Sequence, residues 1–204
     1  MTGEILRSSS ARDTVALHAC CGPCLIEPLD ALRSEGHEVI VVFANPNIQP
    51  LEEYVLRRDT LESYARTHGI RTVEIDVGPE TWRDAAGDAS RPERCRACYR
   101  VRLGLVAQWA ARNGVDAVAT TLSVSPYQDA EAIAEEGRAV AQEAGIGFIE
   151  RDYRERYPVA TRRSRAEGMY RQNYCGCLPS RAEAEAEREA RRRTKEAQRR
   201  CPEG

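Results

Sequence analysis

Seven of the eight cysteines of this 204-residue chain lie in three tight groups. The groups are Cys20, Cys21 and Cys24 at the end of TVALHACCGPC, then Cys95 and Cys98, then Cys175 and Cys177. Thiolates bind soft metals, form disulfides and act as nucleophiles. Grouped thiols spread over most of a chain predict a site to which distant segments contribute.

The spacing inside each group suits two sulfur atoms that share one centre. Cys95 and Cys98 stand three residues apart at the start of a predicted helix, which places their Cβ atoms about 5–6 Å apart on one face. A helix N-terminus also favours the thiolate form. Cys21 and Cys24 have the same spacing, and Gly176 allows the backbone to turn between the last two cysteines. This pattern indicates metal binding.

Three kinds of site compete for these thiols. Disulfides fit poorly, because seven is an odd number and nothing in the sequence indicates secretion. Structural zinc takes four ligands in a closed site, which leaves three thiols over. An iron–sulfur cluster also takes four thiolates, and the remaining three could help to hold a second metal with an open position. Zinc stays open as the alternative to iron.

The sequence also predicts the cellular compartment. The N-terminal segment MTGEILRSSSARD lacks the apolar region of a secretory signal. No apolar run approaches the roughly 18 residues of a membrane span. We therefore expect a cytoplasmic protein that does not contact a membrane and whose thiols are kept reduced.

The charge pattern points to an anionic partner near the cysteines. The formal net charge is −2, so the whole molecule is not a general binder of polyanions. Arginines nevertheless flank the second and third cysteine pairs: Arg91, Arg94, Arg96, Arg100, Arg102, Arg162, Arg163, Arg165 and Arg171. We expect them beside an anionic substrate, with solvated helix faces as the alternative.

Alternating strands and helices must position these groups. Strands are predicted at 14–18, 38–44, 71–77, 116–121 and 147–150, and helices at 23–34, 50–68, 95–113, 129–144, 159–169 and 180–200, with one short helix around Trp82. This alternation predicts an α/β fold with a parallel sheet of about five strands and helices on both faces. We expect a flexible arm over 1–13, one catalytic domain over 14–180 and a charged C-terminal helix and tail over 181–204. The cysteine groups would then meet beyond the carboxyl ends of the strands.

Five motifs in register resemble one known family. LHACCGPC, NPNIQPLEEYVLR, RCRACYRVRL, TTLSVSPYQD and YRQNYCGCLPS, from about Val15 to Ser180, are similar to the QueH-type epoxyqueuosine reductases. The resemblance implies a Rossmann-like, nucleotide-alpha-hydrolase-like sheet and a [4Fe–4S] cluster with an additional iron ion, held by the seven motif cysteines without cobalamin. It also implies reduction of the epoxide of epoxyqueuosine in a tRNA anticodon to queuosine, with electrons from an unidentified donor.

Candidate catalytic and substrate-binding residues lie in or beside these motifs. We predict that Cys20 and Asp152 act in catalysis, Asp152 as metal ligand or acid; the alternative is a carboxylate that caps a local turn. His18 is expected to be a packed, hydrogen-bonded histidine. The predicted substrate-binding residues offer rings for stacking, amides and hydroxyls for base edges, and guanidinium groups for phosphates: Asn45, Asn47, Arg96, Tyr99, Ser125, Tyr127, Gln128, Arg171 and Tyr174.

Two other functions remain possible on this pattern. One is another iron–sulfur enzyme that modifies tRNA, such as a thiolase. Such enzymes use ATP and need a phosphate-cradling loop after the first strand, where this chain has Cys20-Cys21-Gly22-Pro23-Cys24. The other is a zinc-stabilised module that binds nucleic acid without catalysis.

Overall fold

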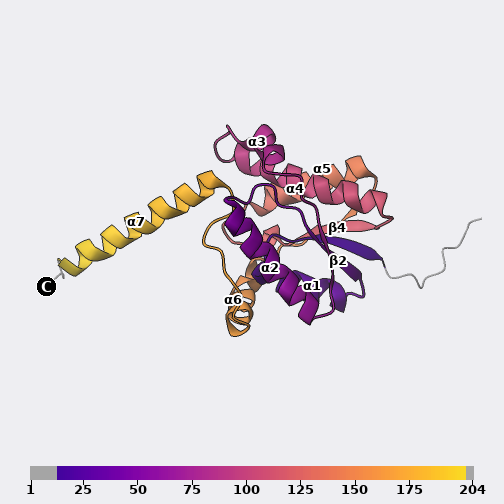
Figure 1. Cartoon of the computed structure of the whole chain (residues 1–204), viewed down its shortest axis with the longest axis horizontal. Helices are drawn as coiled ribbons and strands as arrows, with labels where there is room; N and C mark the ends of the chain where they lie inside the picture. Colours follow the sequence, from indigo (N-terminus) through magenta and orange to yellow (C-terminus); the bar gives the residue numbers. More distant parts are fainter. Residues whose placement is uncertain (1–12, 201–204) are drawn as a thin grey trace, which may run out of the picture.

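A parallel five-stranded sheet forms the centre of the computed structural model, which describes residues 13–200 (Figure 1). The strand order is β3-β2-β1-β4-β5, and every neighbouring pair is parallel. The strands are β1 (Thr14–His18), β2 (Glu38–Phe43), β3 (Arg71–Glu74), β4 (Ala117–Thr120) and β5 (Gly147–Phe148). The predicted fold class is confirmed.

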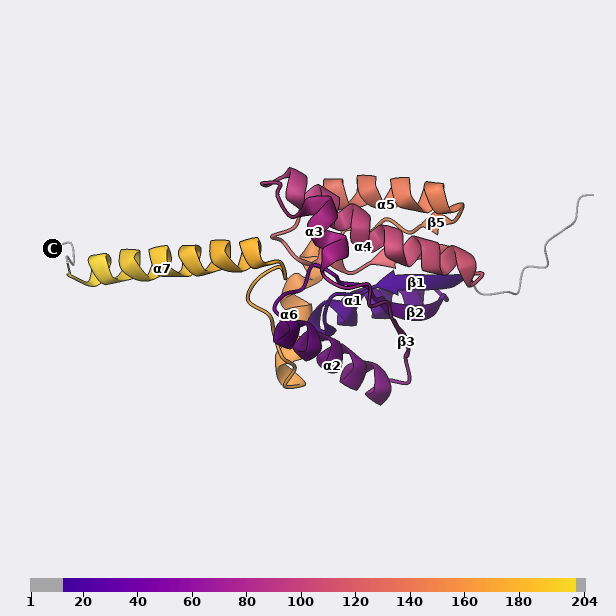
Figure 2. The same cartoon turned by 45° about the horizontal axis from the view of Figure 1, so that its top comes forward.

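Helices cover both faces of the sheet (Figure 2). They are α1 (Gly22–Ser34), α2 (Leu51–Thr67), α3 (Glu80–Ala86), α4 (Glu93–Arg112), α5 (Ala130–Ala144), α6 (Tyr157–Ala166) and α7 (Leu178–Arg200), with 3-10 turns at Leu122–Val124 and Arg154–Arg156. The predicted helices all form, with ends that differ by a few residues. Among the described helices, none combines the length and the apolar character that crossing a membrane requires.

The period of two in β1 explains how the central strand packs. Val15 and Leu17 lie in the core with α1 and α2, whereas Ala16 lies in the core with α4 and α5. A strand buried on both faces needs apolar residues at every position, which is the pattern that the sequence has here. The apolar part of β1 therefore anchors the sheet, and its carboxyl end is left to carry the polar and thiol groups.

The chain crosses from β3 on one edge to β4 on the other side of β1, so the strand order reverses beside β1. In open parallel sheets, ligands bind at the carboxyl ends of the strands at such a point. Cys20 follows β1 and Thr121 follows β4, and the Cys20 Sγ and Thr121 Oγ1 atoms are 4.0 Å apart. The predicted arm over 1–13 lies outside the described residues except for Asp13, as does Cys201.

Candidate metal centre

The first cysteine group lies where β1 ends and α1 begins. Cys21 is the N-cap of α1 in extended conformation, and Pro23 stands in the first turn, where its fixed φ suits a helix. The sulfur atoms of Cys20, Cys21 and Cys24 all lie within 4.8 Å of one another. Three sulfur atoms at this separation can share one metal ion.

The other four cysteines form a second sulfur-rich region. Cys95 and Cys98 lie in the first turns of α4, and Cys175 and Cys177 lie in the loop between α6 and α7. Cys98 and Cys177 are buried in one apolar cluster with Trp82. Burial raises the pKa of the Cys98 thiol to about 12, and the neighbouring Cys175 adds to that rise. The number and type of these ligands match an iron–sulfur cluster.

Gly176 lets the last cysteine loop come close to the end of β2. Its backbone φ is +143°, and a Cβ atom there would lie 2.8 Å from the Nδ2 atom of Asn47. Only glycine adopts such a backbone at no steric cost. The Asn47 side chain is fully buried, and within the described residues neither its Nδ2 nor its Oδ1 atom has a hydrogen-bond partner. Unsatisfied buried amides are rare and call for a partner such as an ion or an ordered water.

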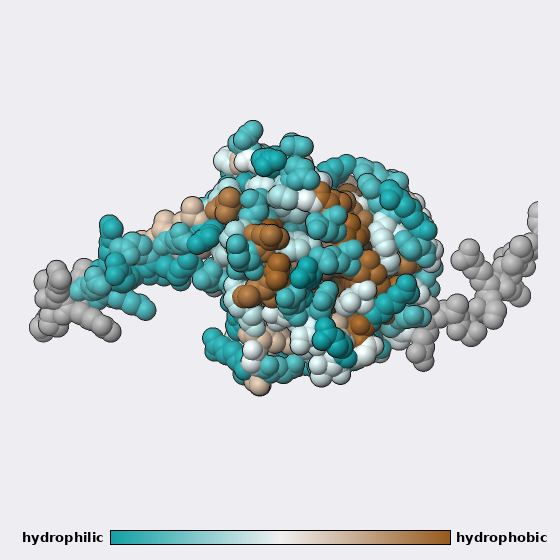
Figure 3. Space-filling model, in the orientation of Figure 1, coloured by the Kyte–Doolittle hydropathy of each residue, from teal (hydrophilic) through white to brown (hydrophobic). Residues whose placement is uncertain are grey.

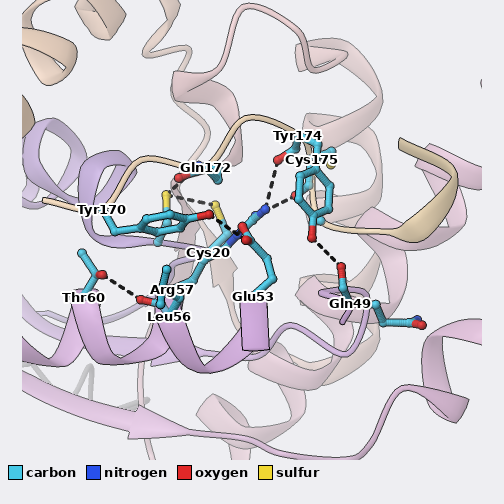
Figure 4. Close-up of polar contacts among 12 residues, drawn as sticks. Cys20, Gln49, Glu53, Leu56, Arg57, Thr60, Tyr170, Gln172, Tyr174 and Cys175 are labelled. Atoms are coloured by element: carbon cyan, nitrogen blue, oxygen red, sulfur yellow. Dashed lines mark hydrogen bonds and ion pairs between the residues drawn. The ribbon is translucent and has the colours of Figure 1, made fainter. Parts of the chain in front are cut away.

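Arg57 of α2 ties this loop to the rest of the domain (Figure 4). Its guanidinium group is buried and donates from Nη1 to the carbonyl of Cys175 at 2.9 Å and from Nη2 to the carbonyl of Tyr174 at 3.0 Å. Its Nε donates to Glu53 Oε1 at 2.7 Å, and Tyr170 donates its hydroxyl to the other Glu53 oxygen at 2.6 Å. One buried cation therefore fixes the backbone that carries Cys175.

Arg102 of α4 lies between the two sulfur groups. It is buried, and its Nη2 donates to Asn45 Oδ1 at 2.7 Å, while its Nη1 lies 4.0 Å from Cys98 Sγ. Burial alone would lower the pKa of this guanidinium, but the sulfur atoms of Cys98 and Cys20 raise it. The cation thus stands within the electrostatic reach of both groups.

The residues present fit a metal–thiolate group. Arg102 has no carboxylate among its described hydrogen-bond partners, and its Nε atom has no partner at all among those residues. A buried cation without an anion is strongly destabilising. Thiolates bound to iron carry the negative charge that would offset this cost, and sulfur is the donor that iron–sulfur centres use.

A cavity of about 510 Å³ opens beside both groups. Cys20 and Cys24 line it from the first group and Cys175 from the second, and the Arg102 guanidinium lies in the same wall. Four further arginines line it, Arg91, Arg171, Arg188 and Arg191, together with the acidic residues Glu183 and Glu187. The arrangement can hold a small neutral group beside sulfur-bound metal and an anionic chain at the rim.

Comparison with known proteins decides the family. The family model described as "Epoxyqueuosine reductase QueH" matches residues 15–183. A protein of that name from Histophilus somni (strain 129Pt) is 33% identical over 187 residues, which cover 88% of this chain and 76% of the relative. One from Thermotoga maritima is 32% identical over 174 residues, covering 81% of this chain and 88% of the relative. The chain belongs to the epoxyqueuosine reductase QueH family.

Solved structures agree with the QueH assignment at the level of the fold. The "U34-tRNA thiolase NcsA from Methanococcus maripaludis with its [4Fe-4S] cluster" superposes with a TM-score of 0.56 at 13% identity and covers 86% of this chain and 65% of that one. A predicted tRNA methyltransferase subunit from Methanocaldococcus jannaschii gives a TM-score of 0.50 at 14% identity, covering 73% of this chain and 74% of that one. At these identities the likeness concerns the fold alone.

Five of the predicted substrate-binding residues of this QueH chain line the cavity: Ser125, Tyr127, Gln128, Arg171 and Tyr174. Tyr99 supports them from α4, because its hydroxyl donates to Gln128 Oε1 at 2.7 Å, and Gln128 Nε2 in turn donates to Cys175 Sγ at 3.2 Å. Tyr127 is 75% exposed, and its ring packs edge-on against Tyr157. A tyrosine so placed leaves a ring face free for stacking.

Two polar residues at the ends of β1 and β2 are buried and hydrogen-bonded within the domain. Asn45, predicted to bind substrate, is fully buried and bridges Arg102 and the carbonyl of Ala19, to which its Nδ2 donates at 2.9 Å. His18 is fully buried with its Nδ1 atom 3.0 Å from Thr120 Oγ1, and burial lowers its pKa to about 3, so the ring is neutral. The prediction of a packed histidine is confirmed.

Two other predicted residues lie outside the cavity. Arg96 is exposed on α4, pairs with Glu135 and Glu136 of α5 and does not line the cavity, so its contact with substrate stays a prediction. Among the described residues, the Asp152 carboxylate accepts hydrogen bonds from the backbone and side chain of Arg154 alone, which is the turn-capping alternative, and it does not line the cavity. In both cases a nearby opposite charge satisfies the side chain.

Three residues that contact the cysteine groups, Arg102, Arg57 and Gln172, were not predicted from the sequence to do so. Arg102 follows Cys98 by four residues and so shares its helix face, a relation that the arginine-rich composition concealed. Arg57 and Glu53 have the same spacing on α2. Gln172 donates its Nε2 to Cys21 Sγ at 2.9 Å and lies in an irregular loop, where spacing carries no information.

Proposed function

We propose that this chain is an epoxyqueuosine reductase that converts epoxyqueuosine in a tRNA anticodon to queuosine. The observation that supports this most directly is the pair of sulfur groups beside one cavity in a chain of the QueH family. Loss of the epoxide oxygen leaves an alkene and releases water, and it consumes two electrons and two protons. The electrons come from a separate donor, a reduced protein or small molecule.

The distribution of sulfur atoms supports a division of the ligands. Cys95, Cys98, Cys175 and Cys177 would hold a [4Fe–4S] cluster, since four thiolates are its usual ligand set. Cys20, Cys21 and Cys24 would then hold the additional iron ion. When bound, these groups supply electrons and a Lewis acid for the C–O bond.

The protein side chains around the cavity bind and orient the substrate. Tyr127 offers its exposed ring for stacking, and Ser125 and Gln128 offer hydrogen bonds to a base or to a ring diol. Arg171 donates from Nη1 to Ser164 Oγ at 2.5 Å, which holds its guanidinium at the rim, where it can meet a phosphate. Tyr174 donates its hydroxyl to the carbonyl of Gln49 and packs under Arg57, so it shapes the wall.

Two buried arginines hold the wall of the cavity in place. Arg57 and Arg102 fix the two sulfur-bearing segments from opposite sides, one through backbone carbonyls and the other through Asn45. Preorganised donors and cations act strongly where water is excluded. Asn45, which Arg102 holds, donates to the carbonyl of Ala19. The fold therefore fixes the backbone next to Cys20, which we propose as a catalytic residue, before any substrate binds.

The decisive experiment combines composition with turnover. Protein purified without oxygen should contain iron and acid-labile sulfide in a ratio of five to four, the stoichiometry of one [4Fe–4S] cluster with one further iron, and should convert epoxyqueuosine to queuosine in tRNA with a chemical reductant. Dependence on ATP would favour thiolation instead. A colourless protein that holds only zinc and leaves the nucleoside unchanged would refute the proposal and favour a zinc-stabilised binding module.

A further inference from the structure

Helix α7 projects away from the rest of the domain (Figures 1 and 2). Its first turns are tied down: Glu183 pairs with Arg91 and with Arg94, and Arg188 Nη1 donates to the carbonyl of Asn173 at 3.1 Å. Past Arg188 the described ion pairs run within the helix itself, between arginines 191, 192 and 193 and glutamates 187 and 189. The outer half of α7 is thus held by its base and by its own side chains.

The two halves of α7 differ in charge. Residues 178–189 contain two arginines and four glutamates, for a formal charge of −2. Residues 190–200 contain five arginines and one lysine against one glutamate, for a formal charge of +5. The chain as a whole carries −2, so the residues outside 190–200 together carry −7. The outer half of α7 is therefore a local basic element on an acidic protein.

The composition of this outer half excludes apolar partners. Its only apolar residues are alanines, which cannot supply the large side chains of a coiled-coil seam or of a membrane-inserted face. Figure 3 shows a largely hydrophilic surface along the outer half of α7, which we call the C-terminal arm. Arg191, Arg192 and Arg193 are exposed, and guanidinium groups suit phosphate oxygens because each offers a planar pair of donors. The charge is complementary to a nucleic-acid backbone.

The arm is continuous with the cavity. Glu187, Arg188 and Arg191 line the cavity mouth, and the helix continues from there to Arg200. At a rise of about 1.5 Å per residue, this last stretch extends about 14 Å beyond Arg191. A polyanion with one nucleoside in the cavity would pass beside this helix. The match to the family model ends at residue 183, so the arm lies outside the part that the family defines.

We propose that the outer half of α7 is a phosphate-binding arm that contacts the backbone of the RNA substrate outside the nucleoside in the cavity. This inference rests on the proposed function for the identity of the RNA. It assigns α7 to affinity for the RNA and leaves the chemistry to the sulfur centre.

The test compares two full-length triple variants of the metal-loaded protein. One is Arg192→Gln/Arg193→Gln/Lys195→Gln, which removes three charges that do not line the cavity. The control is Arg66→Gln/Arg71→Gln/Arg112→Gln, which removes three exposed charges at the opposite end of the sheet. Binding of a tRNA transcript is measured by fluorescence anisotropy at several salt concentrations.

Each lost phosphate contact reduces the slope of log K against log salt by about 0.7–0.9. Three lost contacts reduce it by about two to three, so the parent protein should lose roughly 15- to 60-fold more affinity than the arm variant between about 50 and 200 mM salt. The control variant should keep the parent slope. The free nucleoside epoxyqueuosine, which carries no phosphate, should bind the parent and the arm variant equally.

Equal slopes for the arm variant and the parent would overturn the inference. It would also be overturned if the parent sediments as a dimer that the arm substitutions dissociate, because α7 would then join two copies of the chain. Both readouts are independent of turnover. If the parent protein binds tRNA through the C-terminal arm but never reduces epoxyqueuosine, the proposed function is wrong and the inference about the arm still stands.

Discussion

Replacement of Arg57 by methionine should free the loop that carries Cys175 and Cys177. The substitution keeps a long apolar stem in place and removes three donors, two to the carbonyls of Tyr174 and Cys175 and one to Glu53. Removing one partner of a buried ion pair costs about 3–5 kcal/mol, because the other charge stays buried and unpaired. The Glu53 side chain is only 12% exposed and loses its described ion pair, and the carbonyls of Tyr174 and Cys175 lose their donors as well, so the upper part of that range applies.

The assay is urea unfolding of the reduced, metal-free protein, followed by measurement of iron after reconstitution. A urea dependence of about 2 kcal/mol/M converts this loss into a midpoint about 2–2.5 M lower than that of the parent. Iron and sulfide per chain should fall together, because the displaced loop carries two of the four proposed cluster ligands. Arg58→Met is the matched control on the same helix: Arg58 is partly exposed and pairs with Asp59. Its loss should change stability by about 0.5 kcal/mol or less.

The reasoning would be refuted by Arg57→Met protein with the parent midpoint and full iron content. It would also fail if Arg57→Lys behaved as the parent. A lysine has a single ammonium group and cannot reach two carbonyls and a carboxylate in the geometry of a guanidinium.

Three further outcomes follow from the site. Cys98→Ser should abolish sulfide and most of the iron, whereas Cys24→Ser should keep sulfide and lose about one iron per chain; equal losses in the two variants would contradict the division of ligands. Arg171→Gln should raise the apparent KM for tRNA about tenfold, as expected for about 1.4 kcal/mol of lost phosphate binding. Arg96→Gln, whose charge is already paired with α5, should leave KM unchanged. Gly176→Ala should destabilise the reduced protein by about 1–3 kcal/mol in thermal unfolding and lower its iron content. The reasons are its left-handed backbone and the overlap of the new methyl group with a buried amide nitrogen; an unchanged Tm would disprove this steric argument.

The sequence alone was sufficient to predict the helices and strands and the edge of the sheet at which the cysteine groups meet. The apolar runs of β1 and β2 could only be buried strands, since each is apolar at successive positions. Cysteine spacing was equally informative, because residues three apart at a helix start share a face whatever the rest of the fold does. These are local relations, which a sequence expresses directly.

Tertiary structure alone decided which thiols are neighbours and which charges are free. Cys175 lies near Cys98 of α4 because the loop after α6 returns to that end of the sheet, and no sequence spacing records that path. Arg96 and Arg102 are alike in sequence, yet one pairs with glutamates of α5 in solvent and the other is buried against Cys98 and Asn45. Burial and charge pairing depend on segments that meet only after folding, so the roles of these arginines could be assigned only from the folded chain.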